Sequence, residues 1–158
     1  MQQRLRGQGC QLASAASVRC PPAKEGIIYA DLCGSGLNST DSAGQADHTA
    51  VLQAALNASD AHTVVLRNLS ARTPWVSSPL CIWKSHRTVH FQGAFLMAKR
   101  GVACRRAGQH TCFWGTGDSL LHVYARQNVS ITGEAGATLR MWKQVSEACC
   151  TSLPSMYR

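Results

Sequence analysis

Two stretches of the sequence repeat one pattern: alternating polar and apolar residues, a glycine, and a second alternating run that ends in Met-x-Lys. The first copy, TVHFQGAFLMAK, runs from Thr88 to Lys99, and the second, NVSITGEAGATLRMWK, runs from Asn128 to Lys143. Alternation with a period of two is typical of β-strands that bury one face. Because neither copy can bury its apolar face alone, the repeat predicts strands that stack on one another.

The alternation also predicts which side chains point into the core. In the first copy we expect Val89 and Phe91 to point inward, followed after Gly93 by Phe95 and Met97. The matching inward residues downstream are Leu121, Val123, Val129, Ile131, Ala137, Leu139 and Met141, with Gly133 at a bend. A β-sandwich would produce the same alternation, so it stands as the alternative to a stacked solenoid.

One helix is expected upstream of the repeats, in the segment DHTAVLQAALNAS, where Asp47 is suited to cap the first turn. Its apolar residues recur at helical spacing: Val51, Leu52, Ala55 and Leu56. A strand is expected to follow at 63–69, which is rich in β-branched residues. The run at 73–83 is interrupted by Pro74 and Pro79, so we expect it to lie at bends or edges.

This helix and strand resemble the opening of pectate lyases and polygalacturonases, which belong to the pectin lyase fold superfamily. The residues in the family's D-D-T-A-A-L-Q-A-A helix motif are Asp47, His48, Thr49, Ala50, Leu52, Gln53, Ala54 and Ala55. Residues 63–66 match the strand motif, while His48 replaces an acidic residue and Arg67 replaces a proline. The resemblance covers roughly Gly26 to Lys143. It implies an all-β fold, a right-handed parallel β-helix with an N-terminal capping α-helix.

The pattern divides the chain into three parts, with two prolines after Cys20 and the loss of strand periodicity after Lys143. We expect a flexible lead-in at 1–24, the cap and first coils of the β-helix at 25–143, and an irregular tail at 144–158. Catalytic residues of the family come from central coils, and its N-T-D, D-D and G-H-G motifs do not occur in this sequence. We therefore expect a truncated, N-terminal portion of such a protein, without a complete catalytic site.

The charge distribution favours an anionic partner. The chain carries a net charge of +8, and from Arg67 onward twelve bases face three acids. The leading hypothesis is a polysaccharide-active or carbohydrate-binding protein, with acidic polysaccharide as the favoured class of partner. One alternative is an active polysaccharide lyase or glycoside hydrolase. Another is a basic polyanion or nucleic-acid binder, which the few scattered aromatic residues make the weaker hypothesis.

Individual residues can be assigned to these hypotheses. Asp118 and Lys99 are the candidates for catalysis: Asp118 lies at a loop-to-strand junction, and Lys99 could neutralise the carboxylate of an acidic sugar in a lyase reaction. If Met141 points inward, Trp142 points outward, where its ring could stack on a sugar. Together with Arg140, Lys99 and Arg100 it makes up the expected carbohydrate-binding set. Each of these residues also has a plainer interpretation, as a turn acid, a solvated basic loop or a packed tryptophan.

Cysteines and glycosylation sequons indicate an oxidising compartment. The chain has eight cysteines without a C-x-x-C pair, and four N-x-S/T sequons at Asn38, Asn57, Asn68 and Asn128. We expect an extracellular or secretory-pathway protein, although no signal peptide is evident.

Cys104 and Cys112 are the candidate disulfide, which would contribute about 2–3 kcal/mol by closing a short loop. The spacing of these cysteines and the nearby histidines matches no zinc pattern, so no metal or other cofactor is expected. No apolar run is long enough to span a membrane.

Overall fold

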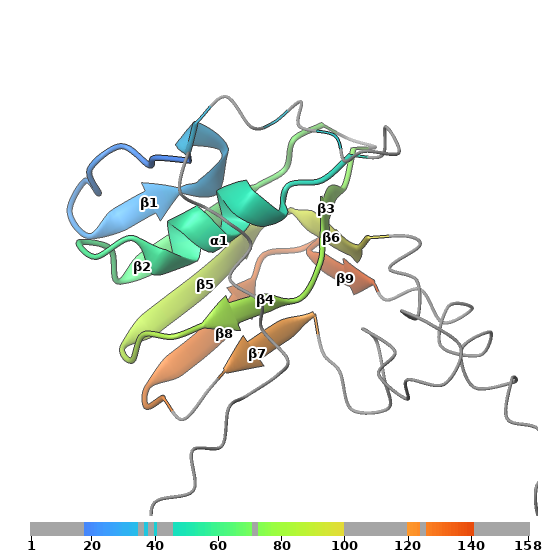
Figure 1. Ribbon diagram of the computed structural model, residues 1–158. Helices are drawn as coiled ribbons and strands as arrows, with labels where there is room; N and C mark the ends of the chain where they lie inside the picture. Colours follow the sequence, from blue (N-terminus) through green and yellow to red (C-terminus); the bar gives the residue numbers. More distant parts are fainter. Residues whose placement is uncertain are drawn as a thin grey trace, which may run out of the picture.

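The computed structural model describes residues 18–34, 37, 40, 46–70, 73–99, 120–123 and 126–140 (Figure 1). The elements in chain order are β1 (Ile27–Tyr29), the 3-10 turn η2 (Ala30–Leu32), α1 (Thr49–Asn57), β2 (Thr63–Arg67), β3 (Trp75–Ser77), β4 (Leu80–Ile82), β5 (Arg87–Gln92), β6 (Phe95–Ala98), β7 (Leu121–Val123), β8 (Val129–Gly133) and β9 (Thr138–Arg140).

The strands form three sheets, and every pairing between them is parallel. The first sheet has the order β1-β2-β5-β8, the second β3-β6-β9, and the third is the pair β4-β7. The chain visits the sheets in turn, so β2, β3 and β4 lie in different sheets before β5 returns to the first. The described chain is therefore mostly parallel β-sheet with one helix, which packs against β3, β4 and η2 (Figure 1).

The first copy of the repeat shows both a confirmed and a wrong prediction. Val89 and Phe91 are buried in β5, as the alternation predicts. After Gly93, however, the buried residues are Ala94, Leu96 and Ala98, so the prediction of an inward Phe95 and Met97 is wrong. The cause is the tight corner at Gly93, which has a φ of +60°. The left-handed conformation, which glycine adopts freely, turns the chain within one residue, so that Ala94 already points inward.

The second copy pairs with the first in the β5–β8 and β6–β9 ladders. Ile131 pairs with Val89, and Leu139 pairs with Leu96, so both lie on the inward face of their sheets. Val129 and Ala137 pack against the core, whereas Ile131 and Leu139 are 46% and 52% exposed. Met141 lies outside the described residues.

Gly133 does not form the bend that the pattern predicts. It is the last residue of β8, and the positive φ of +87° occurs later, at Gly136. A Cβ atom at Gly133 would lie 2.8 Å from the Cβ of Ala137, closer than two carbon atoms can approach. The glycine is therefore needed for close packing rather than for a turn.

The two prolines of the 73–83 run immediately precede strands. Pro74 comes before β3 and Pro79 before β4, and each of these strands lies at the edge of its sheet, as predicted. All six residues of the two strands are nevertheless buried. Their free edges are covered by α1 and the residue before it.

The helix supplies side chains that take the place of a neighbouring strand. The main-chain amide of His48 donates to the carbonyl of Val76 at 2.8 Å, and its Nδ1 accepts from the amide of Val76 at 3.0 Å. The Thr49 hydroxyl accepts from the amide of Ser78, and the Gln53 amide group bonds both main-chain groups of Cys81. Because buried main-chain groups need partners, these side chains close the edges of β3 and β4.

The helix ends agree only in part with the sequence prediction. The apolar face of Val51, Leu52, Ala55 and Leu56 is buried as expected. The cap position is occupied by His48, so the prediction of Asp47 as the capping residue is off by one position. Asp47 still accepts from the amide of Thr49 at 3.0 Å.

The far end of the helix is held by two cations. Lys84 and Arg87 donate to the carbonyl of Ala58 at 3.1 and 2.9 Å. Positive charge at a helix C-terminus is favourable because the carbonyls there carry partial negative charge. Burial lowers the pKa of both side chains, and the attraction of Asp60 partly offsets that effect.

A disulfide between Cys20 and Cys33 joins the segment before β1 to the residue after η2. The predicted lead-in at 1–24 is described only from Val18 onward, and here Ala23 also donates its amide to Asp60 at 2.6 Å. Cys81 is disulfide-bonded as well. The candidate pair Cys104 and Cys112, like the tail at 144–158, lies outside the described residues.

Candidate functional site

Several of the residues singled out in the sequence are not among those described. Asp118, Arg100, Trp142 and Asn38 lie outside the described ranges, so their predicted roles stay predictions. The described candidates are Lys99, Arg140, Asn57, Asn68 and Asn128.

Lys99 is engaged in an ion pair that binds the end of β6 to the start of the helix. Its Nζ lies 2.6 Å from Oδ2 of Asp47, and its side chain is only 14% exposed. Burial alone would raise the pKa of Asp47, but hydrogen bonds from Lys99 and Thr49, with the charge of Lys99, bring it below the ordinary value of 3.8. Arg140 is exposed on β9, in register with Met97. The Lys99 ammonium thus has a structural partner, whereas Arg140 faces solvent.

A larger group of polar side chains lies on the outward face of the four-stranded sheet. The ladder places Tyr29, Val65, His90 and Thr132 in one row across β1, β2, β5 and β8. Arg67 and Gln92 form the next row. We call the following set the polar face: Tyr29, Asp31, Arg67, His90, Thr132 and Glu134. Parallel pairing aligns these residues because alternate positions on neighbouring strands share one side of a sheet.

At one end of the polar face, Arg67 is held flat by two neighbours. Its Nε donates to Oδ1 of Asp31 at 3.0 Å, its Nη2 donates to Oδ2, and its guanidinium lies 4.6 Å from the centre of the Tyr29 ring. The hydrogen bonds to Asp31 raise the pKa of Arg67 and outweigh the opposing effect of burial. With 42% of its side chain exposed, Arg67 is a fixed cation that still faces solvent.

At the other end, three side chains form a hydrogen-bonded row. Nδ1 of His90 lies 2.9 Å from the Thr132 hydroxyl, and Nε2 lies 3.4 Å from Oε1 of Glu134. A carboxylate only accepts, so the tautomer that uses both contacts carries its proton on Nε2 and accepts the Thr132 proton at Nδ1. The row therefore orders a hydroxyl, an imidazole and a carboxylate as in sites that activate a nucleophile.

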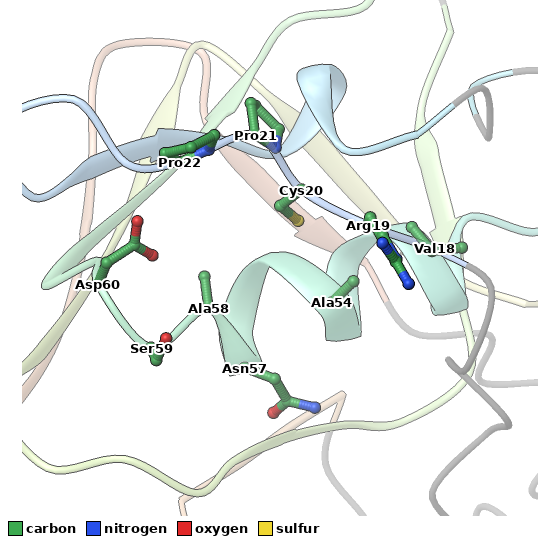
Figure 2. Close-up of a pocket in the computed structure, with 10 residues that line it drawn as sticks. All are labelled: Val18, Arg19, Cys20, Pro21, Pro22, Ala54, Asn57, Ala58, Ser59 and Asp60. Atoms are coloured by element: carbon green, nitrogen blue, oxygen red, sulfur yellow. The ribbon is translucent and has the colours of Figure 1, made fainter.

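A concavity lies on another side of the molecule, between the segment Val18–Pro22 and the end of the helix (Figure 2). Its volume is about 530 Å³, and Figure 2 shows Arg19 and Asp60 at opposite ends of it. Two of its polar side chains already have partners, since Asp60 accepts from Ala23 and Asn57 accepts from Gln53. Small side chains such as Ala54 and Ala58 line the rest. This concavity offers fewer available polar groups than the polar face.

The sequence predictions missed every member of the polar face. In the sequence Arg67 stands out only as a departure from a family motif, and Glu134 lies in a turn that is expected to be solvated. The only signal was that His90, Thr132 and Glu134 fall on the outward positions of the two repeats. Their contact depends on the register that pairs His90 with Thr132, which alternation alone does not define.

Within the described ranges, no three His, Cys, Asp or Glu side chains lie close enough together to hold a metal ion. Over the same ranges no helix has the length and apolar character needed to cross a membrane. No protein-family model matches the chain, and neither a curated protein nor a solved structure matches it.

Proposed function

We propose that this protein is a carbohydrate-binding protein with the architecture of a right-handed parallel β-helix. Support comes from the order in which the chain visits three parallel sheets, since each return to the first sheet adds one strand beside the previous one. Crossovers between parallel strands are right-handed in nearly all proteins. The helix that covers the edges of β3 and β4 has the position expected of an N-terminal cap.

The polar face is the proposed binding surface. The observation that carries the proposal is that Arg67, His90 and Thr132 lie on one face of three neighbouring parallel strands about 4.8 Å apart, with His90 and Thr132 in one row and Arg67 in the next. Such a row offers one polar group after another to an extended chain of sugar rings. Arg67 is the group suited to a sugar carboxylate, because guanidinium and carboxylate form paired hydrogen bonds. The net charge of +8 also favours an acidic polysaccharide, because a positively charged protein attracts a negatively charged chain.

Binding to a glycan array at low and high salt, followed by titration calorimetry with the retained sugar, tests the proposal. Arg67→Ala and His90→Ala are expected to weaken binding at least tenfold. Arg19→Ala is the matched control, since it removes the same charge from an exposed position outside the polar face. Equal losses in Arg67→Ala and Arg19→Ala, with binding abolished by salt, would support non-specific polyanion binding and contradict the proposal.

The row of Thr132, His90 and Glu134 favours a second candidate function, the hydrolysis of esters carried by a polysaccharide. Glycoside hydrolysis needs two facing carboxylates, and this row contains one. In ester cleavage, Oγ of Thr132 would attack the carbonyl carbon while Nδ1 of His90 takes its proton and passes it to the departing alcohol. Water would then hydrolyse the acyl-threonine. Release of acetate from an acetylated polysaccharide, lost in Thr132→Ala and in His90→Gln, is the expected result. No release by the unaltered protein would exclude it.

A further inference from the structure

The last described strand of each sheet presents apolar side chains that no other described residue covers. Val123 in β7, Ile131 in β8 and Leu139 in β9 are 44%, 46% and 52% exposed. Each pairs with a fully buried residue of the preceding strand: Ile82, Val89 and Leu96. The three side chains therefore extend the apolar core to one end of the molecule. Of the three strands at that end, β8 is the longest.

The opposite end differs because there the helix closes the edges of β3 and β4, in two of the three sheets. His48, Thr49 and Gln53 occupy the main-chain groups of β3 and β4 with hydrogen bonds. A head-to-tail stack of molecules needs an open edge at both ends, whereas contact between two identical open ends produces a closed pair. Because two of the three sheets have a closed edge at that end, contact between two open ends, which gives a two-fold dimer, is favoured over a fibre.

The sequence of β8 and its flanks is self-complementary when two copies run antiparallel about Ser130. In that register Val129 of one copy lies opposite Ile131 of the other, on the inward face. Asn128 immediately precedes the strand, with a φ of +54°, and lies near Thr132 of the other copy at the end of the paired segment. Arg126 precedes the strand and Glu134 follows it, so the antiparallel arrangement brings the positively charged end of each β8 toward the negatively charged end of the other.

We propose that two copies of this chain associate through the edges of β8, antiparallel and centred on Ser130, with Leu139 and Val123 completing the apolar contact. The dimer joins the two four-stranded sheets into one continuous sheet. It thereby removes an exposed strand edge, which is otherwise a site of non-specific aggregation. This inference does not depend on carbohydrate binding, and its test has a different readout.

Disulfide trapping with Ser130→Cys tests the register in the full chain, prepared without N-glycans because Asn128 lies in the proposed interface. Residues directly opposite each other on antiparallel strands have Cα atoms about 4.5–5.5 Å apart, within the range that a disulfide spans. We expect a covalent dimer on non-reducing gels beyond any background of the unaltered protein. The matched control is Thr132→Cys, because its copies would lie about 13 Å apart and should not cross-link. Cross-linking of Thr132→Cys but not of Ser130→Cys would contradict the proposal.

Light scattering after size exclusion tests the association itself. The unaltered chain is expected to be a dimer, and Ile131→Lys is expected to be a monomer with an unchanged circular dichroism spectrum. Leu32→Lys adds the same charge at another exposed apolar position and should leave the dimer intact. A monomeric unaltered chain, or a dimer that survives Ile131→Lys, would overturn the proposal.

Discussion

The side-chain amide of Gln53 is paired with the main chain of Cys81 as a neighbouring strand would be. Its Nε2 donates to the Cys81 carbonyl at 2.9 Å, and its Oε1 accepts from the Cys81 amide at 3.0 Å. Gln53 is 5% exposed, so water is not available to replace it. The helix therefore does more than cover an apolar surface, since it also completes the hydrogen bonds of β4.

Replacing Gln53 should destabilise the protein more than the loss of side-chain volume alone would. Gln53→Ala leaves two buried main-chain groups without partners, and we expect the free energy of unfolding to fall by about 2–4 kcal/mol. Gln53→Glu keeps the acceptor but loses the donor at neutral pH, so it should also destabilise. Urea denaturation measures both changes, and the exposed Gln92→Ala is the control. A loss of under about 0.5 kcal/mol in Gln53→Ala would show that the pairing contributes nothing.

The ion pair of Asp47 with Lys99 predicts a stability that falls in acid. Because the folded-state pKa of Asp47 lies below its ordinary value of 3.8, the carboxylate stabilises the fold fully at pH values above 3.8. The contribution is lost as the pH falls through the lower folded-state value. Asp47→Asn should therefore cost about 1–3 kcal/mol at neutral pH and progressively less in acid. Urea melts of both proteins across this range measure the difference, and a difference that grows in acid would contradict the assignment.

The disulfide of Cys20 with Cys33 should contribute strongly to stability. Its cysteines are 13 residues apart, and closing a loop of similar length is worth about 3 kcal/mol in the chain-entropy model. The double variant Cys20→Ser with Cys33→Ser should lose stability of that order in urea. Non-reducing peptide mapping checks the pairing independently, and a peptide that joins Cys20 to any other cysteine would contradict it.

The glycosylation sequons are not equivalent in the folded chain. Asn68 is exposed after β2, whereas Asn57 is half-buried in the helix and accepts a hydrogen bond from Gln53 at 3.1 Å. We expect protein made in a secretory pathway to carry a glycan on Asn68 and not on Asn57. Intact mass with Asn68→Gln and Asn57→Gln measures this. A mass loss in Asn57→Gln would contradict the ranking. Asn128 lies at the edge of β8, so a glycan there and the proposed dimer exclude each other.

Local patterns were sufficient to predict the helix, the strands beside it and the inward face of β5. Val51, Leu52, Val89 and Phe91 are buried because helical or alternating spacing leaves only one face for apolar residues. The inward face of β6 could not be predicted in this way, because the chain turns at Gly93 with one residue fewer than the alternation assumes. A shift of one residue moves every later side chain to the other face of the sheet.

The polar face could not be predicted from the sequence, for a different reason. His90 and Thr132 meet only through pairing between distant strands, and nothing in either strand alone encodes that register. The same limitation applies to Arg67 and Asp31, which lie on separate elements. Sequence periodicity describes one strand at a time, whereas a site on a sheet is a property of several.

The parallel ladders have a consequence for the order of folding. Each strand of the first sheet pairs with one that the chain reaches only after a long excursion, as when Val64 meets Val89 and Val89 meets Ile131. Among the described elements, α1 and the short turn η2 form from local contacts, and the strand edges that α1 closes belong to residues that follow it. We expect a slow refolding reaction that starts around the helix and β2 and proceeds in one direction, toward β8, because each strand provides the template for the next.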